Sequence, residues 1–226
     1  MIKGLFFDFY DTLCYVNDAV YFEGKKKMAD VLGVEMELFF SEWRKTGMDS
    51  LIGKLGTTKE RIMKVAFVLG INLSSETAEE LEKIDWEYLH NAAELYPNTE
   101  KVLNMLKRER FKLGIISNAS DTVETLRKKF NLQQYFDVIN FSYQLKTKKP
   151  DKPIYLSALE SLGLTPEESV YTGDGNDSEL DTAYDLGFKT ILITQKRNDR
   201  FRNAESNKYH HEINDISEIF NIINEE

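Results

Sequence analysis

The chain has 226 residues and a formal net charge of -9, with 42% hydrophobic and 30% charged residues, which is the composition of a soluble globular protein with one or two domains. The negative charge and the scattered basic residues argue against nucleic acid or a membrane as a partner, and no signal peptide or membrane span is expected. A single cysteine, Cys14, excludes an internal disulfide and suits a reducing compartment, so we expect a cytoplasmic monomer or homodimer.

The first predicted element is a buried strand formed by the apolar run Gly4-Leu5-Phe6-Phe7, which ends at Asp8. In an open α/β sheet, ligands bind just beyond the carboxyl ends of the strands. Asp8 would therefore stand at the mouth of a binding site. An acid in this place is more often a turn residue or a helix cap, so its functional interpretation depends on the later segments.

Residues 15–93 lack such apolar runs and show helical periodicity instead, which predicts an insertion of four helices. The clearest start is the capping box between Thr57 and Glu60, which is followed by apolar residues at helical spacing until Gly70. The expected helices cover residues 18–32, 39–45, 58–69 and 75–88. Because this block follows the strand that ends at Asp8, we expect it to form a cap over the carboxyl edge of a sheet.

From residue 94 onward, strands and helices alternate. The predicted strands cover residues 111–117, 138–141, 169–173 and 190–194, and the predicted helices cover residues 99–108, 121–130, 153–162, 178–186 and 216–223. Such alternation indicates a parallel sheet with right-handed crossovers and helices on both faces. We therefore predict an α/β core of five to six strands, built from residues 1–14 and 94–226, with residues 15–93 as the inserted cap.

Four segments carry candidate functional residues in a fixed order. Asp8 follows the first strand, and two later strands end in Ser117-Asn118 and in Asp174. Lys149 lies between them, in Lys149-Pro150-Asp151 at the head of a predicted helix. A nucleophilic carboxylate, a phosphate-binding hydroxyl, a lysine and a metal-binding acid thus occur in that order.

This ordered set resembles the haloacid dehalogenase-like hydrolase superfamily, which consists mostly of phosphatases with an aspartate nucleophile. The resemblance covers nearly the whole chain. Each motif is weak alone, but four in order at sensible spacing form a strong signal. The resemblance implies a Rossmann-like core with a helical cap, a hydrolase activity, a Mg²⁺ cofactor and a small phosphorylated substrate.

The resemblance assigns Asp8 as the nucleophile. A carboxylate can attack a phosphoryl group to give an aspartyl phosphate, which divides one difficult displacement into two easier ones. Both reactants are negative, so a cation is needed, and Mg²⁺ suits a site with one or two carboxylates. Asp174 would be the second carboxylate ligand and the backbone carbonyl of Tyr10 a third. Glu179, or its rival Asp177, would orient metal-bound water.

The remaining assignments concern the phosphate group. Thr12 and Ser117 match hydroxyl positions of the family, and free N–H groups beyond Ser117, at Asn118, could bind phosphate oxygens. Lys149 would pair with the nucleophile and with the transferring group. Ser117 could instead be an ordinary helix cap, and Lys148 could take the place of Lys149.

One position departs from the phosphatase pattern. Phosphatases of this superfamily usually have a second aspartate two residues after the nucleophile, which protonates the leaving alcohol and activates water. Here that position is Tyr10, and Asp11 replaces the usual glycine. A tyrosine, with an ordinary pKa of about 10, can donate a proton but is a poor base near neutrality.

Three functions remain open at this point. The leading one is a magnesium-dependent phosphatase that favours good leaving groups. Tyr10 also resembles the corresponding residue of the 2-haloacid dehalogenases, which use no metal, but those enzymes have a neutral sequence at Asp174. The third is a catalytically silent binding protein. Arg44 of the cap could contact a substrate anion but fits a surface residue better, and Cys14 fits a packing role.

Overall fold

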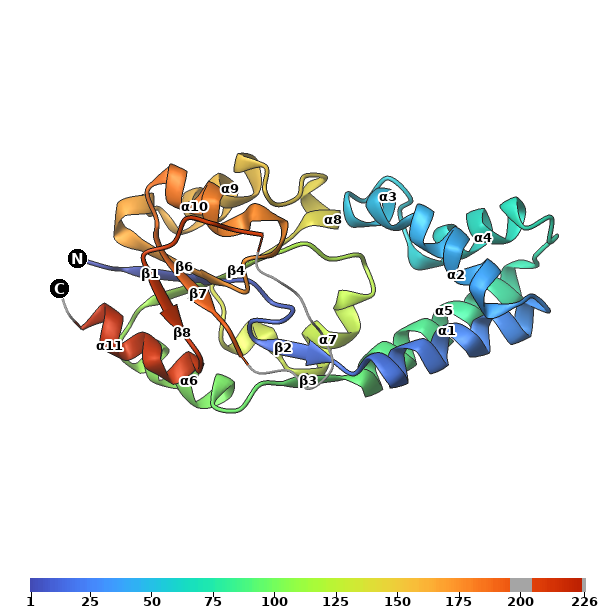
Figure 1. Ribbon diagram of the computed structural model, residues 1–226, viewed down its shortest axis with the longest axis horizontal. Coiled ribbons are helices and arrows are strands. Elements are labelled where there is room, and N and C mark those ends of the chain that lie inside the picture. Colours follow the sequence, from blue (N-terminus) through green and yellow to red (C-terminus); the bar gives the residue numbers. More distant parts are fainter. Residues whose placement is uncertain (196–204, 225–226) are drawn as a thin grey trace.

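The computed structural model describes residues 1–195 and 205–224, which form an elongated molecule with a sheet at one end and a group of helices at the other (Figure 1). The sheet has six parallel strands in the order β5-β4-β1-β6-β7-β8. Its strands are β1 (Gly4–Phe7), β4 (Lys112–Ser117), β5 (Val138–Phe141), β6 (Ser169–Gly173), β7 (Lys189–Ile193) and β8 (His211–Ile213). The predicted α/β fold and the number of strands are confirmed.

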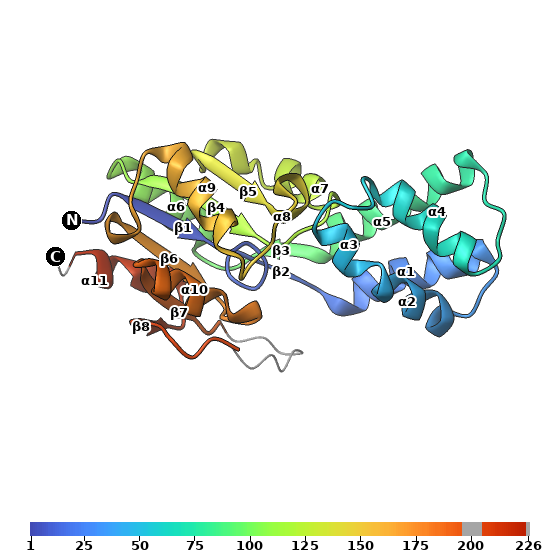
Figure 2. The same cartoon turned by 90° about the horizontal axis from the view of Figure 1, so that it is seen from above.

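Helices cover both faces of this sheet, as the side view in Figure 1 shows, and Figure 2 looks down onto one of these faces. They are α6 (Thr99–Arg108), α7 (Val123–Lys129) and α11 (Ile219–Ile223) on one face, and α9 (Lys152–Leu162) and α10 (Glu179–Leu186) on the other. Side chains alternate along β1, so Leu5 and Phe7 belong to the first cluster of buried residues and Phe6 to the second. Burial on both faces explains why β1 is an uninterrupted apolar run.

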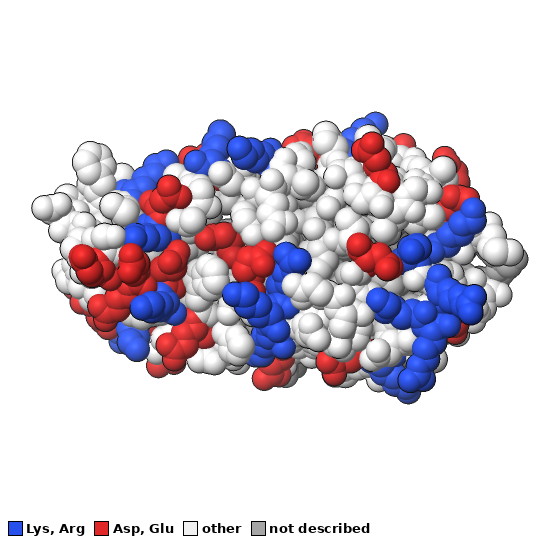
Figure 3. Space-filling model, turned by 180° about the vertical axis from the view of Figure 1, so that it is seen from behind, with Lys and Arg blue, Asp and Glu red and all other residues white. Residues whose placement is uncertain are grey.

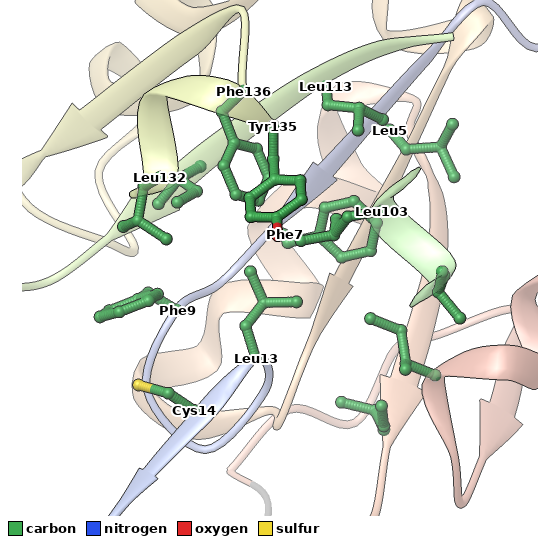
Figure 4. Packing of buried hydrophobic residues seen from close by; sticks show 14 of the residues in the cluster. Leu5, Phe7, Phe9, Leu13, Cys14, Leu103, Leu113, Leu132, Tyr135 and Phe136 are labelled. Atoms are coloured by element: carbon green, nitrogen blue, oxygen red, sulfur yellow. The ribbon is translucent and has the colours of Figure 1, made fainter. Parts of the chain in front are cut away.

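The larger cluster of buried residues surrounds the end of β1 (Figure 4). Phe7 packs edge-on against Phe136, with ring centroids 6.4 Å apart. Phe9, Leu13 and Cys14 follow in the same cluster, and Cys14 is a fully buried free thiol. These contacts hold the loop after β1 against the core, and they agree with the packing role predicted for Cys14.

The helical unit between β2 and β3 has its own core. Its helices are α1 (Asp18–Leu32), α2 (Met36–Lys45), α3 (Gly47–Leu51), α4 (Thr58–Val68) and α5 (Ser75–Ala92). Phe39, Trp43 and Ile62 are among the buried residues that hold them together. The four predicted helices are present, together with the five-residue α3, which is too short to show periodicity. The capping box of Thr57 is confirmed at the start of α4.

Two short antiparallel strands join the helical unit to the core. They are β2 (Cys14–Val16) and β3 (Ala93–Leu95), and they pair Val16 with Ala93 and Cys14 with Leu95. The chain therefore leaves the core and returns to it side by side (Figure 1). Neither strand was predicted, because three residues carry no readable alternation.

A second link between core and helical unit lies near α8 (Ser142–Leu145). The Ser142 hydroxyl donates to the carbonyl of Leu51 at 2.7 Å, and the N–H and hydroxyl of Thr58 each donate to Asp121 at 2.7 Å. The α4 N-terminus thus uses an acid of the core as a hydrogen-bond acceptor. These bonds hold the helical unit against the core beside the ends of the strands.

The surface carries both signs of charge. On the face shown in Figure 3, lysine and arginine side chains are interspersed with aspartate and glutamate. Within the described ranges, no helix is both long enough and apolar enough to cross a membrane.

Candidate active site

The carboxyl ends of three neighbouring strands bring the predicted residues together. Asp8 follows β1, Ser117 ends β4 and Asp174 follows β6, and all three line one cavity of about 440 Å³. Lys149 joins them from the loop before α9. The four segments that the sequence places in order therefore meet at one site. The cavity is also lined by Tyr10, Asn118, Asp177 and Glu179, whereas Thr12 lies buried outside the lining.

Lys149 is the central cation of the site. Its Nζ is buried and donates to Asp8 Oδ1 at 2.6 Å, to the Tyr171 hydroxyl at 3.2 Å and to Glu179. Burial alone lowers the pKa of Lys149, but the neighbouring Asp8 and Glu179 carboxylates more than compensate and leave it raised. The rival Lys148 donates to the backbone carbonyl of Lys149 instead. The geometry thus favours Lys149 over Lys148 as the residue that faces Asp8.

Three acids crowd around this lysine. Asp8, Asp174 and Glu179 each offer a carboxylate oxygen, and these oxygens all lie within 4.8 Å of one another. Burial, followed by repulsion from Glu179 and Asp8, raises the pKa of Asp174 to about 8. A hard divalent cation with oxygen ligands would relieve this repulsion. The donor set therefore fits Mg²⁺, with Asp8 and Asp174 as the carboxylates that would hold it.

Glu179 and Asp177 differ in their surroundings. Glu179 is fully buried, and its Oε1 accepts from the Gly175 N–H at 3.1 Å while its Oε2 accepts from the Tyr171 hydroxyl at 2.7 Å. A Cβ at Gly173 would lie only 2.0 Å from Glu179 Oε1, so the glycine makes room for this acid. Asp177 accepts from the Asn118 amide at 2.7 Å. Of these two, Glu179 belongs to the acid cluster.

Three buried hydroxyls lack a hydrogen-bond partner among the described residues. They are Ser117 Oγ, which lines the cavity, and Thr12 Oγ1 and Thr172 Oγ1, which do not. A buried hydroxyl without a partner costs free energy, so Ser117 suits a ligand rich in oxygen, such as phosphate. Ser117 is not a helix cap, because the N-cap of α7 is Thr122.

Asn118 connects three parts of the site. Its amide donates to the Lys149 carbonyl at 3.0 Å and to Asp177, and its Oδ1 accepts from the Lys149 N–H at 2.7 Å. The side chain thus fixes the loop that carries the lysine. The phosphate contact predicted for Asn118 would have to come from its backbone.

The loop after Asp8 holds the two unusual residues. Burial, then the nearby Cys14 and Tyr21, raises the pKa of Tyr10 well above its ordinary value, so its hydroxyl keeps its proton near neutral pH. Asp11 has a φ of +65°, the left-handed conformation that glycine adopts most readily and that aspartate tolerates. This backbone geometry accounts for the usual glycine at that position.

Sequence reasoning missed Tyr171, which lies inside β6. Its hydroxyl bonds both Lys149 and Glu179, while its ring packs against Tyr155 at 5.4 Å. A tyrosine within an apolar strand usually belongs to the core. The sequence signal that could have indicated a further role was its polar hydroxyl group. Arg44 does not line the cavity and instead lies over the Phe40 ring.

The chain matches the family model for the haloacid dehalogenase-like hydrolases over residues 7–193. It belongs to this family. This haloacid dehalogenase-like hydrolase is 25% identical to the glyceraldehyde 3-phosphate phosphatase of Methanocaldococcus jannaschii, over 99% of the chain and 97% of that protein. It is equally 25% identical to the (S)-2-haloacid dehalogenase 4A of Burkholderia cepacia, over 98% of the chain and 95% of that protein.

Two further matches add to this picture. The Rhythmically expressed gene 2 protein of Drosophila melanogaster is 34% identical, over 50% of this hydrolase and 44% of that protein, so the chain matches less than half of that relative. A crystal structure of a HAD phosphatase from Thermococcus onnurineus superimposes with a TM-score of 0.68 at 23% identity and covers 98% of both chains. The structural match supports the fold, and the relatives include phosphatases and dehalogenases alike.

Proposed function

We propose that this hydrolase is a magnesium-dependent phosphatase of small phosphorylated metabolites that works through an aspartyl phosphate on Asp8. The observation that carries the proposal is Asp174, a second carboxylate, partly buried, whose oxygen lies within 4.8 Å of the Asp8 and Glu179 oxygens. Such a cluster has more negative charge than the single Lys149 can balance. A cation would balance it, and the archaeal glyceraldehyde 3-phosphate phosphatase is similar along the whole chain.

The residues take the following roles in the proposal. An Asp8 oxygen attacks phosphorus, the bond from phosphorus to the leaving oxygen breaks, and water later hydrolyses the aspartyl phosphate. Lys149 holds the nucleophile at 2.6 Å and offsets negative charge on the transferring group. Ser117, which lines the cavity, supplies a hydroxyl for a phosphate oxygen. Mg²⁺, bound by Asp8, Asp174 and the Tyr10 carbonyl, would stabilise the charge that develops on the phosphoryl group.

Tyr10 shapes the choice of leaving group. Its raised pKa leaves it a weak donor and removes it as a base. Acyl and aryl phosphates, whose leaving groups depart without protonation, are therefore the favoured substrates. A Tyr10→Asp variant should gain most on alkyl phosphates, and an equal gain across all leaving groups would contradict this role.

The helical unit, residues 15–93, would act as the cap of this site. It contributes Tyr21, Leu51 and Leu89 to the lining of the cavity that holds Asp8. Its bonds to Asp121 and Ser142 keep it against the core. Closure of such a cap excludes water and places substrate-selecting side chains over the reacting group.

A metal-independent 2-haloacid dehalogenase is the second candidate. Tyr10 favours it, and the Burkholderia cepacia dehalogenase has the same 25% identity to the chain as the archaeal phosphatase. A halide leaves without a proton, so the missing acid would not matter. Asp174 argues against a dehalogenase, because an extra carboxylate beside the nucleophile would repel a halocarboxylate. A catalytically silent binding protein is the third candidate, and the Asp8–Lys149 pair argues against it.

The deciding experiment measures phosphate and chloride release from matched panels of phosphate esters and 2-haloacids, with Mg²⁺ and with EDTA, using Asp8→Asn as the control. Phosphate release that needs both Mg²⁺ and Asp8 is the expected result. Chloride release that survives EDTA, and an Asp174→Asn variant that keeps it, would identify the dehalogenase. If neither phosphate nor chloride is released in any assay, and beryllium fluoride with Mg²⁺ does not change the melting temperature, the result would favour the binding protein.

A further inference from the structure

The loop that joins Asp174 to Glu179 has an unfavourable backbone conformation. Gly175, Asp177 and Ser178 have φ angles of +81°, +53° and +51°, and two of these three residues are not glycine. Left-handed conformations cost free energy in residues that have a Cβ, so they persist only where surrounding contacts hold them. The placement of both acids therefore depends on what holds this loop.

The helix that carries Glu179 is capped from a distant part of the chain. The helix α10 begins at Glu179, and its N-cap residue, Ser178, makes no side-chain capping bond within the described residues. The first N–H groups of a helix have no partner inside the helix. One of them, the Leu180 N–H, donates to Ser206 Oγ at 3.0 Å, across 26 residues of sequence. Ser206 is 5% exposed, so this bond is shielded from water.

The same segment also holds the beginning of the loop. The N–H groups of Glu205 and Ser206 both donate to the carbonyl of Gly175 at 2.9 Å. On its other side, the N–H of Gly175 donates to Glu179 Oε1 at 3.1 Å. Gly175 thus connects the distant segment to the carboxylate of the buried acid.

Further contacts join α10 to residues 205–208. Asp181 Oδ1 accepts from the N–H groups of Asn207 and Lys208 at 2.7 Å and 2.6 Å. The Lys208 Nζ donates to both carboxylate oxygens of Asp185, at 2.8 Å and 2.9 Å. These contacts are exposed, so water can replace them at little cost. The buried hydroxyl of Ser206 is harder to replace, which makes it the residue to examine.

We propose that Ser206 is a positioning residue of the active site, which holds the loop from Asp174 to Glu179 so that both acids stay beside the nucleophile. The proposal rests on the phosphatase function proposed above, because these acids matter through the Mg²⁺ ion that they would surround. Ser206 does not line the cavity, so it acts through Gly175 and the first turn of α10. Residues that orient the groups around a metal commonly change its affinity about tenfold or more.

A serine-to-alanine substitution tests this role. Ser206→Ala removes the hydroxyl that caps Leu180, and the Kd for Mg²⁺ should rise about tenfold, as measured by the dependence of the melting temperature on Mg²⁺ concentration. The matched control is Ser169→Ala at the start of β6, which removes an equally buried hydroxyl that donates to the Thr165 carbonyl at 2.8 Å. The control should keep the wild-type Kd.

Two results would overturn the positioning role. One is the same Kd in Ser206→Ala and in the wild type, which would leave the proposed phosphatase intact. The other is an equal rise in Kd in both alanine variants, because that would be an effect of lost stability and not of the loop.

A measurement without metal separates this proposal from the proposed function. In the EDTA-treated protein, the Gly175 N–H should exchange with solvent at least about threefold faster in Ser206→Ala than in the wild type, and at the wild-type rate in Ser169→Ala. If Mg²⁺ does not change the melting temperature of the wild type, the magnesium-dependent phosphatase is overturned. The exchange rate then decides on Ser206 by itself, and an unchanged rate would overturn its role as well.

Discussion

The two walls of the cavity are built in opposite ways. On the core side, Asp8, Lys149 and Glu179 are joined by short hydrogen bonds, and each is almost completely buried. On the side of the helical unit, the cavity is lined by Tyr21 and Leu51, neither of which carries a charge. The contrast teaches that the proposed reacting groups and the remaining surface of the cavity come from different segments of the chain. The rate of the reaction and the choice of substrate should therefore respond to different substitutions.

Removal of the nucleophile should give the largest effect. An Asp8→Asn variant keeps the size of the side chain but loses the attacking carboxylate, so kcat on acetyl phosphate should fall at least about a thousandfold. The control is Asp30→Asn, an exposed acid of α1 that should keep wild-type turnover. Residual activity of the Asp8 variant within tenfold of wild type would show that another group attacks phosphorus.

Tyr171→Phe should have a smaller effect on turnover, because Tyr171 contacts Lys149 and Glu179 from behind the cavity lining. The ring can keep its packing, but Lys149 and Glu179 lose a shared hydroxyl, so kcat should fall about tenfold. Because Tyr171 does not line the cavity, KM should change little. Tyr184→Phe, at an exposed tyrosine, serves as the control. A rise in KM without a change in kcat would place Tyr171 in substrate binding instead.

The crowding of acids predicts a pH dependence of the metal-free protein. The folded-state pKa of Asp174 is raised to about 8, so between pH 4 and 8 the folded state binds more protons than the unfolded state does. The free energy of unfolding should therefore fall as the pH rises through this window. Asp174→Asn removes this titration and should stabilise the EDTA-treated protein at pH 8 by at least about 1 kcal/mol.

Thermal melts at pH 5 and pH 8 measure this effect, with Asp30→Asn as the control. Mg²⁺ should raise the melting temperature of the wild type at pH 8 and leave that of Asp174→Asn nearly unchanged. Equal stabilisation of both proteins by Mg²⁺ would remove Asp174 from the metal site.

The contact between core and helical unit should give the smallest effect. Thr58→Val removes the hydroxyl that donates to Asp121 but leaves the backbone N–H in place, so the free energy of unfolding should fall by about 1 kcal/mol. If the helical unit closes over the substrate, KM and kcat should change together by about twofold to threefold. Ser161→Ala, which removes an exposed hydroxyl of α9, is the control. Unchanged kinetics would mean that this contact is purely structural.

Much of the core side could be predicted from the sequence. Strands buried on both faces read as apolar runs, so the residues at their carboxyl ends, Asp8, Ser117 and Asp174, could be placed at one edge. The spacing of Lys149 before a helix then completed the set. The catalytic roles of these residues stay predictions until they are measured.

The rest could not be predicted, for identifiable reasons. Tyr171 acts through contacts with residues distant in the sequence, and an interior position of an apolar strand gives no sign of them. Tyr21, Leu51 and Leu89 form one wall only because three helices fold toward the same cavity. Helical periodicity shows that a residue is on an apolar face, but it does not show which surface that face covers.

The pairing of β2 with β3 has a consequence for how such a protein could arise and be rebuilt. Val16 and Ala93 are directly opposed partners in an antiparallel ribbon, so the whole helical unit occupies the position of a hairpin turn. A short Asn-Gly turn between these two residues would close the ribbon without moving the sheet. An exchange of the helical unit would thus join the chain at this ribbon, and the replacement would also have to restore the contacts that Leu51 and Thr58 make with Ser142 and Asp121.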